Sequence, residues 1–204
     1  MTSSKAVRVP VQERARKRRE AILDATARVL DRGGYDALNT NAVAREANAA
    51  VGTVYEYFES REALLAGLLE RHAARVAEAV DAAIAEGGDD PLAIADRVVD
   101  AFARVWRKEP GYRAAWSSAQ VTNLLLETGN AWSETFTARI ALLVRAVAPK
   151  TSAADARVVG STAVHLVSGL LLVAMSSPPA TSRALVAETK LALRAYLSAR
   201  LGFG

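Results

Sequence analysis

Apolar residues along this chain recur every three or four positions, as Ile22, Ala25 and Val29 do near its start. This spacing places them on one face of an α-helix, whereas the alternation of apolar and polar residues that builds strands is almost absent. The pattern therefore predicts an all-α fold of about nine helices joined by short loops.

Residues that cap or break helices divide this pattern into segments. Asparagine, serine and aspartate are favoured N-caps, glycine ends helices, and proline suits the first helical turn. The helices predicted on this basis cover, in chain order, about residues 11–32, 40–47, 51–58, 61–86, 91–108 and 112–119, one or two stretches before residue 149, and residues 152–176 and 182–201.

The second and third predicted helices are short and are separated by a three-residue turn. Asn48 begins this turn, and asparagine tolerates the left-handed backbone conformation that ends many helices. Such spacing is typical of a helix-turn-helix, in which the second helix enters the major groove of DNA. Four apolar residues are expected to support the motif from a shared core: Leu38, Val43, Val54 and Phe58.

Residues 13–69 resemble the DNA-binding domain of the tetracycline-repressor (TetR) family. The most specific part is Gly-Thr-Val-Tyr-x-Tyr-Phe-x-Ser-Arg-Glu-x-Leu at residues 52–64. The resemblance implies a nine-helix homodimer whose C-terminal domain binds an inducer. It also implies DNA contacts at Thr40, Asn41, Val51, Gly52, Thr53, Tyr55 and Tyr57, with Arg61 in the place of the family's phosphate-binding lysine.

Two residues in this region depart from the family pattern. Ala50 stands where the family commonly has a serine N-cap, and Glu56 places a carboxylate on a helix that is expected to approach DNA. These departures leave open an alternative, namely a helical dimeric interaction protein with degenerate DNA binding. Retention on a DNA column is the measurement that separates the two functions.

Positive charge is concentrated at the start of the chain. Residues 1–19 carry seven lysines and arginines and one glutamate, whereas residues 20–71 carry five basic and nine acidic residues. A basic segment beside an acidic helix-turn-helix predicts that this arm supplies much of the electrostatic attraction to DNA phosphates.

Aromatic residues gather between positions 102 and 136, and all three tryptophans of the chain are among them. Ordinary core packing explains any one of them, but together they predict an apolar cavity between helices, where bundles usually bind ligands. The residues expected to contact a small hydrophobic ligand are Phe102, Trp106, Trp116, Asn123, Trp132, Phe136 and His165.

The last two predicted helices are apolar around much of their circumference. A helix with two apolar stripes must bury both, one in its own core and one against a partner, so these helices are assigned to a homodimer interface. The most apolar run, 163–175, is shorter than the roughly 20 residues of a membrane helix, which predicts a cytoplasmic protein without a membrane partner.

No catalytic constellation is found, and the absence of cysteine and the presence of only two histidines argue against a metal site. We therefore expect no enzyme activity, no metal and no cofactor, and an enzyme that uses the cavity is the least supported function. The expected domains are residues 1–60, which bind a double-stranded DNA operator, and residues 61–204, which bind a ligand and dimerise. The predicted function is a ligand-responsive transcriptional regulator, a repressor released from a palindromic operator by a small hydrophobic inducer.

Overall fold

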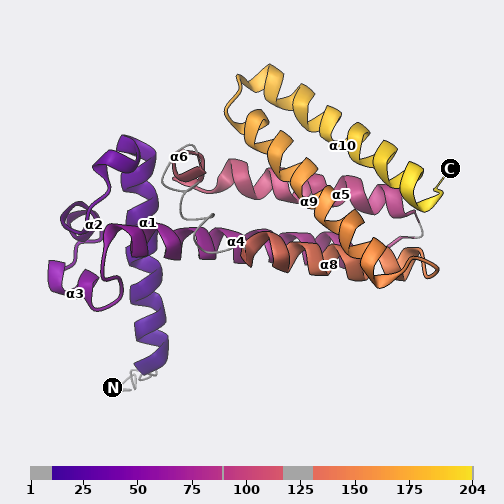
Figure 1. Cartoon of the computed structure of the whole chain (residues 1–204). Coiled ribbons are helices and arrows are strands. Elements are labelled where there is room, and N and C mark those ends of the chain that lie inside the picture. Colours follow the sequence, from indigo (N-terminus) through magenta and orange to yellow (C-terminus); the bar gives the residue numbers. More distant parts are fainter. Residues whose placement is uncertain (1–10, 89, 117–130, 204) are drawn as a thin grey trace, which may run out of the picture.

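The structure is a computed structural model that describes residues 11–88, 90–116 and 131–203, and within these ranges all regular structure is helical (Figure 1). This confirms the predicted all-α fold. The helices are α1 (Val11–Ala37), α2 (Thr40–Glu46), α3 (Val51–Tyr55), α4 (Arg61–Ala85), α5 (Pro91–Lys108), α6 (Tyr112–Trp116), α8 (Ala131–Val147), α9 (Ala153–Met175) and α10 (Pro179–Leu201).

Local chemistry sets most of the helix ends. The side chain of Asn39 accepts a hydrogen bond from the Ala42 amide at 2.8 Å and so caps α2. Ser60 caps α4 through the Ala63 amide at 3.1 Å in the same way. These side chains satisfy backbone donors that the first helical turn leaves without partners, which is why the predicted starts of both helices agree with the structure.

Three helix ends differ from the predictions. The helix expected to stop before Gly33 continues to Ala37, and only Gly34, at φ 66° and ψ −168°, interrupts its helical geometry. Helix α3 ends at Tyr55 rather than Phe58, and α10 begins at Pro179 because proline fits the first turn of a helix. The predicted extension of α6 to residue 119 lies outside the described residues.

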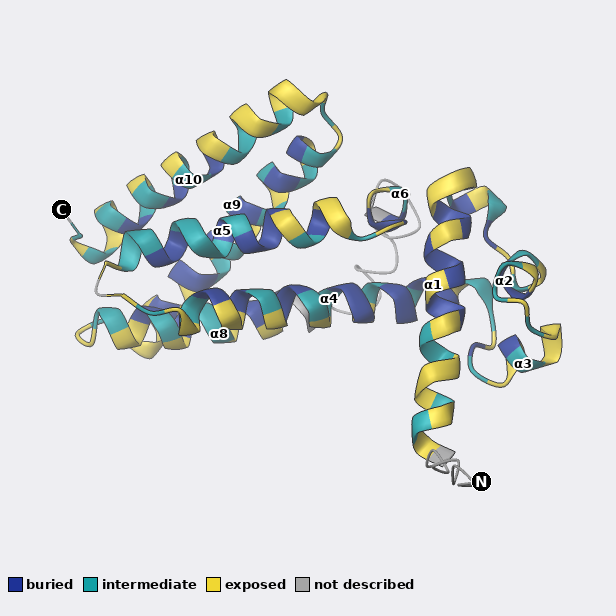
Figure 2. Cartoon of the chain, turned by 180° about the vertical axis from the view of Figure 1, so that it is seen from behind, coloured by how far each residue is buried: buried dark blue, intermediate teal, exposed yellow. Residues whose placement is uncertain are grey.

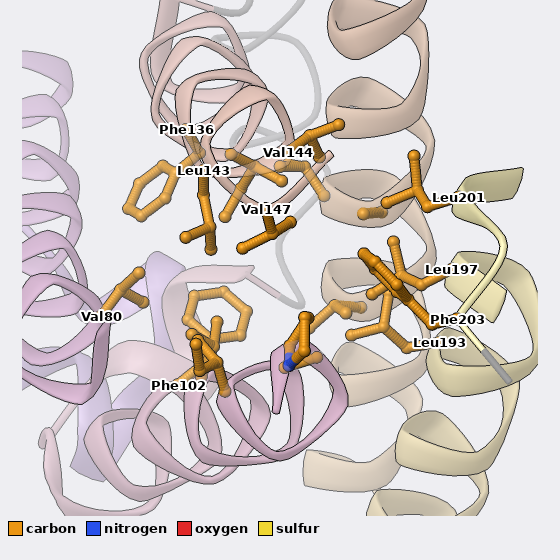
Figure 3. Close-up of a pocket in the computed structure, with 18 residues that line it drawn as sticks. Val80, Phe102, Phe136, Leu143, Val144, Val147, Leu193, Leu197, Leu201 and Phe203 are labelled. Carbon is orange, nitrogen blue, oxygen red and sulfur yellow. The ribbon is translucent and has the colours of Figure 1, made fainter. Parts of the chain in front are cut away.

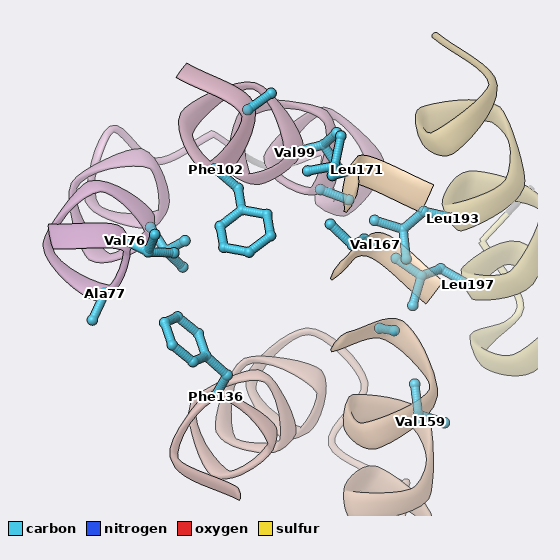
Figure 4. Close-up of a cluster of buried hydrophobic side chains, with 14 of the residues drawn as sticks. Val76, Ala77, Val99, Phe102, Phe136, Val159, Val167, Leu171, Leu193 and Leu197 are labelled. Atoms are coloured by element: carbon cyan, nitrogen blue, oxygen red, sulfur yellow. The ribbon is translucent and has the colours of Figure 1, made fainter. Parts of the chain in front are cut away.

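The buried apolar side chains form two separate cores. The first lies among α1 to α3, the start of α4 and part of α6, and extends from Ile22 to Leu68 before taking in Ala115. The second lies among the rest of α4 and helices α5, α8, α9 and α10, from Val76 to Leu197 (Figure 4). Helix α4 therefore contributes to both cores, and it runs from one half of the molecule into the other (Figures 1 and 2).

A buried arginine fixes α4 against α1 where the two helices cross. Arg71 is only 8 % exposed, and its Nη1 lies 2.8 Å from a carboxylate oxygen of Asp24 and 3.3 Å from one of Glu20. A buried cation requires such partners because water no longer solvates it. These ion pairs fix the position of α4 against the half of the molecule that carries α2 and α3.

Candidate DNA-binding surface and ligand cavity

Helices α2 and α3 form a helix-turn-helix on a rigid apolar support. Asn48 in the turn has φ 49°, the left-handed conformation that the sequence predicted for it. Leu38, Val43 and Val54 are completely buried, and Phe58 is 5 % exposed, which confirms the predicted shared core. The motif therefore presents its remaining side chains from a fixed frame.

Several residues predicted to contact DNA lie on one exposed surface. Tyr55 is 51 % exposed, and the hydroxyl groups of Thr40 and Tyr55 lie 3.1 Å apart, so the structure brings the two helices' polar groups together. Val51 and Gly52 are also exposed, and a Cβ added to Gly52 would meet no atom within 4 Å. Backbone and hydroxyl groups are those that proteins use to contact phosphates, and this surface offers both.

The remaining predicted DNA contacts have different surroundings. Asn41 is exposed at the start of α2, whereas Thr53 and Tyr57 are half-buried, and Tyr57 packs against the first core. The guanidinium of Arg61 lies 4.3 Å above the ring of Tyr35, and its Nε is 3.3 Å from a carboxylate oxygen of Glu62. These contacts hold Arg61 beside the motif with part of its side chain in solvent.

The two departures from the family pattern are also visible. Ala50 precedes α3 without any side-chain hydrogen bond to the helix, as its methyl group dictates. Glu56 follows α3 and is exposed, so its carboxylate stays hydrated and the motif bears its cost without desolvation. Neither residue disturbs the apolar support of the motif.

The basic arm continues into the first turns of α1. Arg14, Arg16, Lys17 and Arg18 are exposed there, where α1 projects beyond the first core (Figure 2). Lys17 forms an ion pair with Glu13 at 2.9 Å, one turn earlier. The more N-terminal charges of the arm, Lys5 and Arg8, lie outside the described residues.

A cavity opens in the second core between α4, α5, α8, α9 and α10 (Figure 3). It holds about 850 Å³ of space not occupied by atoms, part of which is open to solvent. All eighteen described residues that line it have apolar side chains, and Leu201 and Phe203 lie at the edge where α10 ends. A ligand buried here would meet hydrocarbon on every described side.

Only two of the seven predicted ligand residues line this cavity, namely Phe102 and Phe136. Trp106 lies behind Phe102, with 4.9 Å between their ring centroids, and forms part of the core rather than the cavity wall. His165 is exposed on α9, where its Nδ1 donates a hydrogen bond to the Ser161 carbonyl at 2.7 Å. Asn123 and the side chains of Trp116 and Trp132 lie outside the described residues.

Most of the cavity wall is aliphatic and was not singled out in the sequence. Val144 on α8 and Val167 on α9 are examples, and Leu193 and Leu197 on α10 were recognised only as an apolar stripe. Their spacing is that of any core residue, so no local pattern marks them as ligand contacts. The available signal was the breadth of apolar surface on the last helices, which exceeds what one core needs.

Helices α9 and α10 expose apolar residues on their outer side. Val173 is 55 % and Leu191 62 % exposed, while the opposite sides of both helices are buried in the second core. Taken over its whole length, α9 is long and apolar enough to cross a membrane, so the shorter run noted in the sequence underestimated it. Core helices of soluble proteins meet the same test, and a third of the most apolar window of α9 is buried here.

These features define the class of protein: a helix-turn-helix DNA-binding unit joined through one long helix to a helical unit with an apolar cavity. Two family models match the chain, "Bacterial regulatory proteins, tetR family" over residues 22–68 and "Tetracyclin repressor-like, C-terminal domain" over residues 90–197. A TetR-family transcriptional regulator from Streptomyces coelicolor is 30% identical, with a TM-score of 0.71 over 90% of this chain and 99% of that one. The chain belongs to the TetR family of bacterial transcriptional regulators, as its sequence suggested.

Curated relatives match over shorter stretches. The transcriptional repressor KstR of Mycobacterium tuberculosis is 37% identical over 109 residues, which make up 53% of this chain and 49% of that protein. The nicotine-responsive repressor HdnoR of Paenarthrobacter nicotinovorans is 33% identical over 89 residues, 42% of this chain and 43% of that protein. The chain thus spans half or less of the length of these relatives.

Proposed function

We propose that this protein is a homodimeric repressor that binds a near-palindromic DNA operator and is released by a small hydrophobic ligand. The observation that carries the proposal is the union, in one chain, of an exposed helix-turn-helix surface and an entirely apolar described cavity wall. The relatives KstR and HdnoR are repressors, and HdnoR is nicotine-responsive, which supports repression controlled by a small molecule. Operator DNA and ligand are then the two partners of this chain.

The DNA-binding unit comprises residues 1–60 and the first turns of α4, which complete the first core. Thr40, Asn41, Val51, Gly52, Thr53, Tyr55, Tyr57 and Arg61 supply its contacts, some to phosphates and some to base edges. The basic arm adds attraction that does not depend on base sequence. Because its partner is DNA, we place the protein in the cytoplasm with no membrane partner.

The chemistry of the cavity limits the ligand. A polar group carried into it would lose its hydration without a side-chain partner on the described wall, which costs about 1–3 kcal/mol. Apolar surface instead gains about 25 cal/mol for each Å² removed from water. The ligand is therefore neutral or weakly charged and mostly hydrocarbon, and any polar group it has remains at the open edge.

The outer faces of α9 and α10 bind a second copy of the chain. Val173 and Leu191 are large apolar residues on these faces, and burying them against the same faces of a partner removes both from water. A two-fold dimer presents two copies of α3, which is why the operator is expected to consist of two inverted half-sites.

Ligand binding releases DNA only if the ligand prefers a conformation in which the two copies of α3 no longer fit their half-sites. Helix α4 is suited to impose this change, because it starts at Arg61 beside α3 and its Val80 lines the cavity. A ligand that moves the cavity half of α4 therefore changes the position of the DNA-binding half.

The test selects a DNA duplex from a random pool with the full chain and then screens neutral hydrocarbon-rich compounds for release of that duplex. The variant Ala163→Leu fills the cavity from α9 and should lower the affinity of a releasing compound at least about tenfold while DNA binding persists. Ala154→Leu, on the exposed side of the same helix, is the matched control. Failure to select any preferred sequence, or release that is unaffected by Ala163→Leu, would contradict the proposal.

A further inference from the structure

Three packed aromatic rings lead from the cavity towards the DNA-binding half of the chain. Phe102 lines the cavity, and its ring centroid lies 4.9 Å from that of Trp106 (Figure 4 shows Phe102 within the second core). Trp106 lies 4.8 Å from Tyr112, and all three side chains are buried. We call these three residues the aromatic relay. Close-packed rings have no free space between them, so a displacement of the first is passed to the last.

The relay makes contact with α4 at its far end. The ring of Tyr112 lies 4.5 Å from that of His72, which is 1 % exposed. Burial, followed by the charges of Arg71 and Arg75, lowers the pKa of His72 to about 3. His72 is therefore neutral at physiological pH and packs against Tyr112 as an uncharged ring.

Helix α6 connects the relay to the other core. Tyr112, its first residue, belongs to the second core, whereas Ala115 is fully buried in the first core. The helix has only five residues. A single helical turn moves as one body, so a shift of Tyr112 also shifts Ala115.

The residue before α6 rests directly on the backbone of α1. A Cβ at Gly111 would lie 2.5 Å from the carbonyl oxygen of Ala27 and 2.9 Å from its Cα, so the two backbones touch. The amide of Gly111 also donates a hydrogen bond to a carboxylate oxygen of Asp31 at 3.4 Å. Since α1 shares its core with α2 and α3, movement of this contact changes the support of the DNA-binding surface.

We infer that the aromatic relay, with the contact between Gly111 and Ala27, transmits ligand occupancy to the DNA-binding unit through α6, alongside α4. Tyr112 and Gly111 are the positioning residues of this path. The inference rests on the proposed ligand-controlled release of DNA and specifies its regulation. It predicts that α6 is required for coupling even when both binding sites are intact.

The test measures the linkage between two binding events on the full chain. The probes are the neutral apolar fluorophore phenylnaphthylamine and a duplex selected by the wild-type chain. Linkage is the ratio of the Kd values for the duplex with and without saturating fluorophore. We expect at least about fivefold linkage in the wild type, because allosteric couplings between two sites commonly have this size.

Two variants interrupt the path at different points. Tyr112→Leu removes the last ring of the relay, and Gly111→Ala forces a Cβ against Ala27. Each should reduce linkage to within about twofold of none, while the fluorophore Kd without DNA changes by less than about threefold. Because Tyr112 is buried, Gly111→Ala tests the path independently if the first variant folds poorly.

Each variant has a matched control. Tyr112→Phe keeps the ring and should keep wild-type linkage. Gly87→Ala places alanine at a similar positive φ, 70° against 71° for Gly111, but its nearest neighbour is 3.8 Å away, so linkage should also persist. Wild-type linkage in both Tyr112→Leu and Gly111→Ala would overturn the inference and leave ligand release standing. A wild-type chain that binds both probes without any linkage would overturn both proposals.

Discussion

Acid should destabilise this protein through His72 more than through an ordinary surface histidine. Its imidazole is buried on α4, and neither ring nitrogen has a hydrogen-bond partner among the described residues. Nε2 lies 3.8 Å from a carboxylate oxygen of Glu109, but that carboxylate also pairs with Arg75. Burial and the neighbouring arginines lower the pKa of His72 from 6.5 to about 3.

The sign and size of the effect follow from these two values. The unfolded chain binds a proton on His72 below about pH 6.5 that the folded chain refuses until about pH 3, so the free energy of unfolding falls as pH falls. The loss approaches about 1.4 kcal/mol per pH unit within this window. Between about pH 7 and about pH 5 it amounts to about 2 kcal/mol, a large share of the stability of a small domain.

Urea unfolding at these two pH values measures the effect, at one fixed protein concentration because a dimer's stability depends on concentration. His72→Phe keeps an aromatic ring against Tyr112 but cannot bind a proton, so it should lose about 2 kcal/mol less than the wild type over the same interval. His165→Gln removes the other histidine of the chain and should retain the loss that is due to His72. Equal losses in the wild type and in His72→Phe would refute this account.

Three further predictions concern the arm, the core and the dimer. Replacing Arg14, Arg16 and Arg18 by alanine should weaken DNA binding and make its dependence on salt shallower by about one unit for each phosphate that the variant no longer neutralises, whereas an unchanged salt slope would count against the arm's role. Gly160→Ala should cost about 1–3 kcal/mol of stability in urea unfolding, because its Cβ would lie 2.9 Å from the Thr137 carbonyl, while the exposed neighbour Thr162→Ala should cost less than about 0.5 kcal/mol. Val173→Lys combined with Leu191→Lys should shift sedimentation towards monomer, and Leu142→Lys, which removes an equally exposed leucine from α8, should not; a dimer that survives the double substitution would disprove the proposed interface.

The sequence predicted the DNA-binding half more completely than the cavity, for a physical reason. Asn48, Ser60 and the buried Val54 act on their own neighbourhoods, so their types report the local backbone and its support. The cavity instead results from how five helices fail to fill the space between them, which no local pattern records. Aromatic residues drew the prediction to Trp106, although the wall is formed mainly by aliphatic residues such as Val144 that look like any core position.

The purely aliphatic and aromatic character of the described cavity wall affects how the proposed sensor would read its signal. Without a hydrogen-bonding group to demand one functional group, selection depends on how well the volume is filled. Each additional buried methylene of a ligand contributes about 0.8 kcal/mol, or about fourfold in affinity, until the chain no longer fits. Members of a homologous series would then release the DNA at concentrations that fall stepwise with length, so the promoter would respond to hydrocarbon size as a graded scale. Exchanging one wall residue for a larger or smaller one would move the cut-off of that scale without changing its slope.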